Sequence, residues 1–426
     1  PFIGIASSFS DLVPGHIGMR DLERQIEKGI HSAGGQSFIF GVPAICDGIA
    51  MGHSGMRYSL PSRDLIADCV EIVAAAHQLD GIVLLSNCDK ITPGMLIGAL
   101  RLNIPAIIVT AGPMLDGECR GQHKLTMVTG SFEAVGRFRK GEISEEELLA
   151  LEEESCPSAG ACQGMYTANT MACLAEVMGM SLPYCSSASA VSSKKRRIAF
   201  DSGMQIVELV KKDIKPSDII TRESLRNAIV ADLALGGSTN TFLHILAIAN
   251  AGGIDVTLND FEELSGKIHQ IVKINPSSTL TMADFHNAGG IPATMKSLEK
   301  FLSDTKTVSG ISTKEIAKQA WADNAIIPEY DQSSYTQAGL SILYGNLAKD
   351  GCVIKTSGVA PECYEFEGTA KTFDSEEEAM EALENDKIKE GDVIVIRYEG
   401  PKGGPGMREM LSLIHISEPT RPEPIS

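Results

Sequence analysis

Aromatic side chains, positive charge and long apolar runs are all scarce in this sequence of 426 residues. Aromatic residues make up only 5%, against 41 glycines, which favours tight turns and backbone-built sites over aromatic cages. Lysine and arginine number 37 against 55 acidic residues, and the resulting net charge of −18 argues against a nucleic-acid partner. Apolar runs are short and interrupted by glycine or charge, which argues against a membrane span.

The ten cysteines lack the regular, compact spacing of a zinc ribbon, a ferredoxin or a disulfide-stapled domain. A chain of this length needs no staples, so we expect a reduced pool of thiols with a few metal ligands. The first residues read as a strand without a basic leader or cleavage site, which favours a cytoplasmic protein. Six cysteines are expected to be ordinary thiols: Cys69, Cys119, Cys173, Cys185, Cys352 and Cys363.

Short apolar runs alternate with amphipathic segments through the first third of the chain. The runs at 2–6, 38–45, 81–86 and 104–110 predict strands, and the last two are apolar enough for a parallel sheet covered on both faces. Helical patterns dominate from about 142 to 302, and β-branched runs return after 345. We therefore predict an αβα domain with a mostly parallel sheet over residues 1–340 and an incomplete β-rich, barrel-like domain over 341–410.

The last segment, 411–426, reads LSLIHISEPTRPEPIS and resembles a translated sequencing adapter. We expect it to be a non-native tail and largely disordered, because Pro419, Pro422 and Pro424 oppose both helix and central strand. A basic run at 194–197, KKRR, is expected to form a solvated face.

Three clusters of chemically capable residues stand out, at 44–53, 86–95 and 155–165. The first two directly follow predicted strands, where ligands bind in open α/β sheets, and each contains a Cys-Asp pair. Soft thiolates would suit iron–sulfur and hard carboxylates would suit magnesium. Buried structural cysteines in glycine-rich turns are the alternative, and spacing alone does not decide between the two. His53 could orient its loop or touch a substrate.

The chain resembles the dihydroxy-acid dehydratases over residues 1–410. The wider superfamily includes the 6-phosphogluconate and other sugar-acid dehydratases. The segments that carry the resemblance include VPGHIGMRDL, CDGIAMGHSGMRYSLPSRDLIADCVE, SNCDKITPGMLIGALRLNIPAIIV, CPSAGACQGMYTANTM, ALGGSTNTFLHILAIA, HNAGGIP, LYGNLAKDGCVIKTSGV and VIRYEGPKGGPGMREM.

The resemblance implies a set of metal ligands. Cluster ligands fall on Cys88 and Cys162. Members with a 2Fe-2S cluster carry a third cysteine after an early proline, and this chain has Pro14-Gly15-His16 there, which favours a 4Fe-4S cluster. The third ligand is then expected to be Cys46, with Cys156 as the alternative. The implied Mg²⁺ ligands are Asp47, Asp89, Glu409 and Lys90, the last as a carbamate.

The implied activity is that of a hydro-lyase, which converts 2,3-dihydroxyisovalerate and 2,3-dihydroxy-3-methylpentanoate to 2-keto acids for valine, isoleucine and leucine synthesis. A homodimer or higher homo-oligomer is expected. The family's proposed base is a serine in a GRFSGG-like motif, and none occurs here, so this chain is expected to lack turnover. A sugar-acid dehydratase and a non-catalytic metal-binding fragment are the alternatives.

Overall fold

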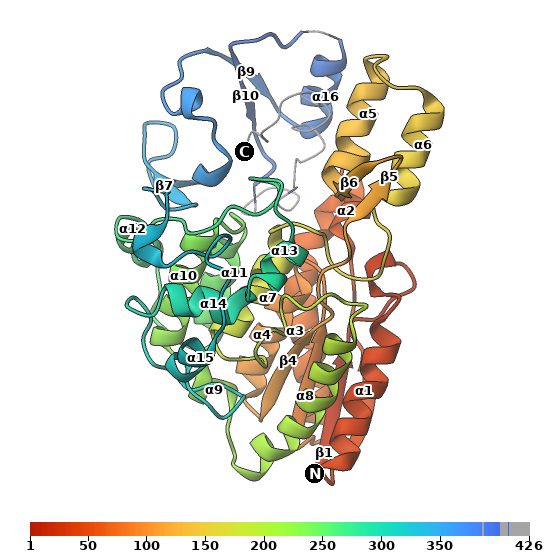
Figure 1. Cartoon of the computed structure of the whole chain (residues 1–426), viewed down its shortest axis with the longest axis vertical. Coiled ribbons are helices and arrows are strands. Elements are labelled where there is room, and N and C mark those ends of the chain that lie inside the picture. Colours follow the sequence, from red (N-terminus) through yellow and green to blue (C-terminus); the bar gives the residue numbers. More distant parts are fainter. Residues whose placement is uncertain (386, 401–407, 409–426) are drawn as a thin grey trace.

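The computed structural model describes residues 1–385, 387–400 and 408. Its centre is a four-stranded parallel sheet in the order β2-β1-β3-β4 (Figure 1). The strands are β1 (Phe2–Ser7), β2 (Gln36–Gly41), β3 (Gly81–Ser86) and β4 (Ala106–Thr110). Every residue of β3 and β4 is buried, as their almost wholly apolar sequences predict for strands covered on both faces.

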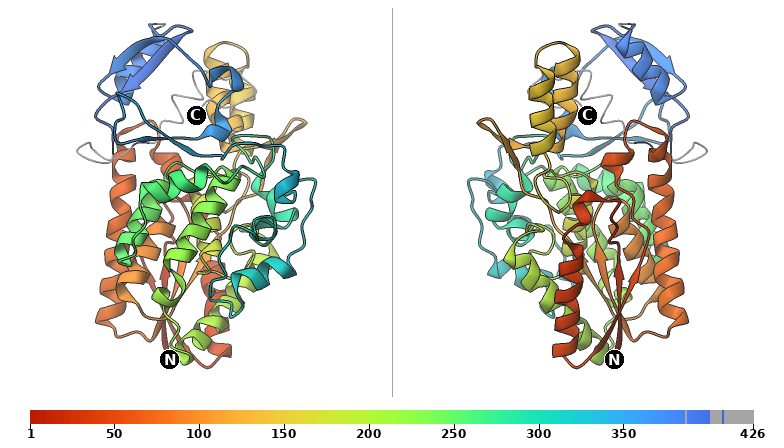
Figure 2. Two further views of the ribbon diagram at one scale, coloured as in Figure 1. Left: turned by 90° about the vertical axis from the view of Figure 1, so that its left-hand side faces the viewer. Right: turned by 90° about the vertical axis from the view of Figure 1, so that its right-hand side faces the viewer.

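Two pairs of helices cover the sheet, one pair on each face (Figure 2). α1 (Met19–Ser32) packs along α8 (Ser193–Lys211), and α3 (Ser59–Ala76) packs along α4 (Ile91–Leu102). This arrangement confirms the predicted αβα layering. Among the described residues, no helix combines the length and apolar character needed to cross a lipid bilayer.

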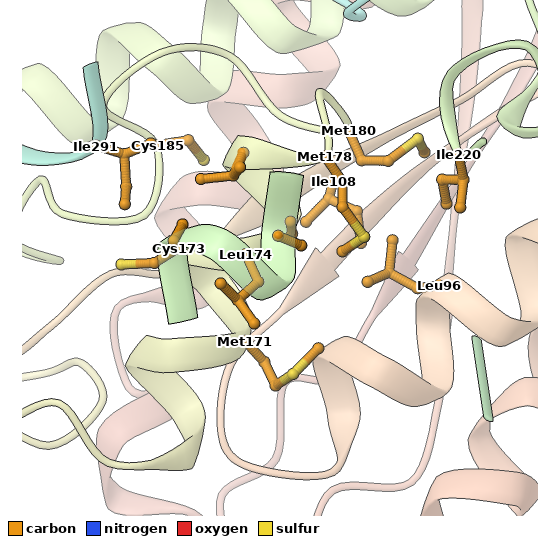
Figure 3. Close-up of a cluster of buried hydrophobic side chains, with 14 of the residues drawn as sticks. Leu96, Ile108, Met171, Cys173, Leu174, Met178, Met180, Cys185, Ile220 and Ile291 are labelled. Atoms are coloured by element: carbon orange, nitrogen blue, oxygen red, sulfur yellow. The ribbon is translucent and has the colours of Figure 1, made fainter. Parts of the chain in front are cut away.

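A further group of helices packs on the outside of α4 and beside β4. Leu96 of α4, Ile108 of β4, and Met171 and Leu174 of α7 meet in the core between them (Figure 3). The backbone N–H of Ile108 donates to the carbonyl of Met180 at 2.8 Å, so the edge of β4 is covered. The helices are α7 (Thr167–Val177), α9 (Pro216–Ile219), α10 (Arg222–Leu235), α11 (Thr241–Ala251), α12 (Leu258–Ser265), α13 (Met282–Asn287), α14 (Gly290–Ser297) and α15 (Thr313–Gln319).

A hairpin of helices, α5 (Glu133–Arg139) and α6 (Glu145–Glu154), projects beyond the carboxyl ends of the strands. The Ser144 side chain accepts a hydrogen bond from the backbone N–H of Glu147 at 3.2 Å and so caps the start of α6. The hairpin packs on β5 (Gly117–Cys119) and β6 (Gln122–Leu125) around a small core of its own.

The C-terminal part is β-rich, as predicted, and lies at the end of the molecule opposite the N-terminus (Figure 1). β7 (Ser341–Leu343) and β8 (Cys352–Ile354) form an antiparallel pair. β9 (Thr369–Phe373) and β10 (Asp392–Ile396) form a parallel pair joined by α16 (Glu376–Glu384). The short remaining helical turns are η1 (Pro14–His16), α2 (Asp47–Ala50), η2 (Ser54–Tyr58), η3 (Val128–Phe132), η4 (Tyr330–Gln332), η5 (Thr356–Gly358) and η6 (Pro361–Cys363).

Two sequence-based expectations need correction. The second strand lies at 36–41 rather than 38–45, because Gly41 pairs with Ser7 and β1 ends there. The prediction that residues 194–197 form a solvated face is wrong for Lys195. Its side chain, in α8, is fully buried and donates to the carbonyls of Thr110 and Cys185. The predicted tail, 411–426, lies outside the described residues.

Candidate active site

A cavity of about 390 Å³ lies at the carboxyl ends of the sheet strands. Its walls come from the loops that follow all four strands and from the segment before α7. The chain continues from β1 to β2 on one side of the sheet and from β3 to β4 on the other. The loops that follow the adjacent strands β1 and β3 therefore lead to opposite sides and leave a crevice between them. Four of the ten cysteines border this cavity: Cys46, Cys88, Cys156 and Cys162.

Cys46 and Cys88 form a hydrogen-bonded pair of thiols in the cavity wall. The pKa of Cys46 is lowered to about 7, chiefly by the hydrogen bond with the Cys88 thiol and further by nearby backbone N–H groups. Together these interactions outweigh burial, which raises this pKa. The same hydrogen bond, together with burial, raises the pKa of Cys88 well above its ordinary value. Cys88 adopts a left-handed backbone conformation with φ +74°, which is uncommon for a residue with a side chain and is typical of functional loops.

Backbone contacts fix the loop that carries Cys162. The N–H of Gly160 donates to the carbonyl of Gly15 at 2.8 Å, and the N–H of Ala161 donates to Gly112 at 2.9 Å. The Asn169 side chain, at the start of α7, donates to the carbonyl of Cys162. The loops that follow β1 and β4 therefore hold Cys162 in register with the sheet.

Cys156 borders the same cavity but is exposed, whereas Cys46, Cys88 and Cys162 are partly buried. The other six cysteines do not border the cavity. All ten are free of disulfides, which agrees with the expected pool of reduced thiols.

Lys90, Asp47 and Asp89 converge beside the thiols. The Nζ atom of Lys90 lies 2.6 Å from Oδ2 of Asp47 and 3.8 Å from Oδ2 of Asp89, and all three side chains are buried. The hydroxyl of Ser59 donates to the other oxygen of Asp47 at 2.6 Å. The two strand-end loops thus bring the Lys90 ammonium between two carboxylates, as their positions after β2 and β3 predict.

Two buried histidines beside this site were missed by the sequence reasoning. His16 is fully buried and borders the cavity, and its Nδ1 lies 2.8 Å from the carbonyl of Ser8. Burial, opposed by that hydrogen bond, lowers the pKa of His16 to about 4. The signal was present in the sequence, because His16 follows Pro14-Gly15, where the resemblance implies a cysteine in members with a 2Fe-2S cluster.

His244, the second, is fully buried in α11. Arg63 Nη1 approaches its Nδ1 at 3.4 Å. Burial, followed by the charges of Lys90 and Arg63, lowers the pKa of His244 well below its ordinary value. A neutral imidazole therefore lies behind Lys90.

The remaining predicted residues have simpler outcomes. Glu409 lies outside the described residues. Its neighbour Arg408 is buried and forms an ion pair with Glu376 at 2.7 Å. His53 orients its own loop, because its Nε2 lies 2.8 Å from the carbonyl of Ile49 and its Nδ1 accepts from the N–H of Gly55 at 3.0 Å.

The arrangement suits iron–sulfur and magnesium in different ways. Within the described ranges, no three His, Cys, Asp or Glu side chains already converge on a point that would hold one ion. A cluster of several irons spreads its ligands over more space than one ion, and thiolate donors facing one cavity fit that demand. The Lys90 ammonium lies between the carboxylates of Asp47 and Asp89. Their negative charges therefore favour a cation at this position.

Two family models and several known proteins match most of this chain. The family model described as dihydroxy-acid/6-phosphogluconate dehydratase N-terminal matches residues 1–316, and its C-terminal counterpart matches residues 325–419. A dihydroxy-acid dehydratase of Thermodesulfovibrio yellowstonii is 58% identical over 413 residues, which is 97% of this chain and 75% of that protein.

Dihydroxy-acid dehydratases of Endomicrobium trichonymphae and Pelobacter propionicus are 57% and 56% identical, again over 97% of this chain and 75% of each relative.

Proposed function

This chain belongs to the dihydroxy-acid/6-phosphogluconate dehydratase family, and on that premise we propose that it is a hydro-lyase acting on 2,3-dihydroxy-3-methyl carboxylic acids. The substrates would be 2,3-dihydroxyisovalerate and 2,3-dihydroxy-3-methylpentanoate, and the products the 2-keto acids of valine, isoleucine and leucine synthesis. The observation that carries the proposal is one cavity that joins four cysteines to a buried Asp-Lys-Asp group.

Cys88 and Cys162 are our proposed ligands of an iron–sulfur cluster, with 4Fe-4S favoured over 2Fe-2S. Both thiols border the cavity, and the contact between Gly15 and Gly160 supports the exclusion of a cysteine at position 15. A Cβ atom on Gly15 would lie 2.2 Å from the carbonyl oxygen of Gly160. Among thiols, Cys46 is the first candidate for a third ligand because it already contacts Cys88, and Cys156 is the second.

Asp47, Asp89, Lys90 and Glu409 are the proposed ligands of Mg²⁺. Hard oxygen donors suit this ion. The Lys90 ammonium occupies the position between the carboxylates where a divalent cation would be attracted. Conversion of the Lys90 amine to a carbamate would remove that cation and supply an oxygen ligand in its place, which accounts for a lysine at this position.

When bound, magnesium would hold the substrate carboxylate and 2-hydroxyl and acidify the C2 proton, while the cluster would act as a Lewis acid toward the 3-hydroxyl. The residues of the chain bind and orient the rest of the molecule. Ile17, Met114 and Met127 give the cavity an apolar wall. Such a wall suits the methyl-branched end of a dihydroxy-methyl acid better than the hydroxyl groups of a sugar acid, which need hydrogen-bonding partners.

A small-molecule substrate follows from the family. We further propose that the protein works in the cytoplasm as a homodimer or higher homo-oligomer, without a nucleic-acid partner. The net charge of −18 supports the last point. Light scattering of the purified chain during gel filtration tests the oligomeric state, and a monomer at micromolar concentration would contradict it.

The test of function is anaerobic reconstitution with iron and sulfide, followed by assays with Mg²⁺ and either 2,3-dihydroxyisovalerate or gluconate. Keto-acid formation from the first substrate would establish the dihydroxy-acid activity, although the absence of a GRFSGG-like motif predicts little turnover by this chain. Preference for gluconate would establish the sugar-acid alternative. Bound iron and sulfide without turnover of either substrate would establish a metal-binding fragment.

Site variants complete the test. Cys88→Ser and Cys162→Ser should each lose most of the bound iron. Cys69→Ser should retain it, because Cys69 lies in α3 and does not border the cavity. Full iron content in both site variants would rule out the ligand assignment.

A further inference from the structure

One polar atom of a residue that borders the cavity has no hydrogen-bond partner among the described residues. It is Nε2 of His16, which is shielded from bulk water. The other ring nitrogen, Nδ1, lies 2.8 Å from the carbonyl of Ser8, and a carbonyl only accepts hydrogen bonds, so Nδ1 carries the proton. Nε2 therefore presents a lone pair. A buried acceptor without a partner is costly, and native proteins seldom leave one without a reason.

The position of His16 is fixed relative to the cysteine loop. The carbonyl of Gly15 accepts the N–H of Gly160 at 2.8 Å, two residues before Cys162. Both residues border the cavity that also contains Cys88. This backbone contact therefore links the position of His16 to that of Cys162. Neither position depends on a long, flexible side chain.

We propose that His16 is a nitrogen ligand of the iron–sulfur group and takes the third protein position beside Cys88 and Cys162. The inference rests on the proposed iron–sulfur function and concerns only the identity of the third donor. Metal-binding histidines almost always donate their other ring N–H to a carboxylate, a backbone carbonyl or water, which fixes the tautomer and the ring orientation. The hydrogen bond from His16 to Ser8 is of this kind.

The competing thiols are less suited to the third position. The Cys46 thiol already pairs with that of Cys88, one of the proposed cluster ligands. Cys156 is exposed. Of these three candidates, only His16 is fully buried and has no hydrogen-bond partner at the atom that would bind iron.

Pulsed EPR of the reduced cluster tests the proposal in the anaerobically reconstituted chain. The wild type should show hyperfine coupling to a directly bound ¹⁴N nucleus, and growth with ¹⁵N-histidine should change that coupling to the ¹⁵N pattern. His16→Asn places an amide N–H where Nδ1 was, so the hydrogen bond to Ser8 is kept while the ligand atom is removed. This variant should lose the coupling and retain less than half of the wild-type iron.

His16→Cys should restore iron retention without nitrogen coupling, which separates ligand loss from misfolding. His77→Asn is the matched control, because Nδ1 of His77 also lies 2.8 Å from a backbone carbonyl, that of Val73, but at the exposed end of α3. It should behave as wild type. A wild-type cluster without nitrogen coupling, or coupling that persists in His16→Asn, would overturn the inference. If the wild type binds no iron and sulfide, the proposed function fails first and the inference falls with it.

Discussion

Lys90 Nζ lies 2.6 Å from Oδ2 of Asp47, and both side chains are buried although they come from different strand-end loops. Ser59 donates to the second oxygen of Asp47, and Asp89 lies 3.8 Å from the same ammonium. In a low-dielectric interior such a group is stable only while both signs of charge are present. The ion pair therefore joins the loops that follow β2 and β3.

Removal of the Lys90 charge should destabilise the metal-free chain. Lys90→Met removes the ammonium that lies between two buried carboxylates, and we expect the free energy of unfolding in urea with EDTA to fall by about 3–5 kcal/mol. Millimolar Mg²⁺ should recover part of that loss, because a divalent cation can take the vacated position. Lys28→Met changes an exposed lysine and serves as the control. If Mg²⁺ does not raise the stability of Lys90→Met, the carboxylates are not a magnesium site.

The contact between Gly15 and Gly160 should tolerate no side chain. A Cβ on Gly15 would lie 2.2 Å from a backbone oxygen, so the loops must separate in Gly15→Ala. We expect a loss of about 2–3 kcal/mol of unfolding free energy and weaker iron binding. Gly41→Ala is the control, since its Cβ would meet no heavy atom within 4 Å. Equal stability of the two variants, measured by chemical denaturation, would contradict this account of the loop packing.

Cys46 should be the most readily alkylated cysteine of the cavity in the metal-free protein. Its pKa of about 7 makes it about half thiolate at neutral pH, whereas the pKa of Cys88 is raised well above the ordinary value. The rate of iodoacetamide labelling at Cys46, followed by peptide mass spectrometry, should rise with a midpoint near pH 7. In Cys88→Ala the midpoint should move upward, because the hydrogen bond that stabilises the thiolate is gone. An unchanged midpoint would show that Cys88 does not tune it.

Stability should fall in mild acid partly through His286. Burial and then the charges of Lys194 and Lys195 lower its pKa to about 4, below its ordinary value of 6.5. As the pH falls, the unfolded chain therefore binds this proton before the folded chain does. The contribution of neutral His286 to the free energy of unfolding is complete above pH 6.5 and is lost as the pH falls toward 4. Allowing for partial exposure, we expect about 1 kcal/mol of differential loss between pH 7.5 and pH 5, absent in His286→Gln. Urea titrations at both pH values measure it, and parallel losses in the two proteins would assign the effect elsewhere.

The strand-end loops could be predicted from sequence because their signals are local. The run at 81–86 is apolar throughout, and Cys88, Asp89 and Lys90 follow it directly, so a reactive loop at the carboxyl end of a buried strand was a sound prediction. The end of a strand is harder to predict, because it depends on the strand with which it pairs. The apolar pattern of β2 continues through Val42, but the strand stops at Gly41, where β1 ends.

Side chains whose role depends on distant carbonyls could not be predicted. Lys195 is one of four consecutive basic residues, and composition alone indicates a solvated face. In the fold its ammonium reaches the carbonyls of Thr110 and Cys185, which lie at the end of β4 and after α7. His16 is a similar case, because its importance depends on which nitrogen is left without a partner, and no sequence pattern specifies that.

The proposed donors come from loops that follow β1, β2 and β3 and from the segment before α7, and this has a consequence for biosynthesis. None of these loops forms a site by itself, since each is placed by a neighbouring strand or by a backbone contact with another loop. During translation the sheet cannot be completed until β4 has emerged, and the loop that carries Cys162 follows later still. An iron–sulfur cluster held by these donors would therefore be inserted into a chain whose first domain has largely folded, and its uptake would report on the native arrangement of that domain.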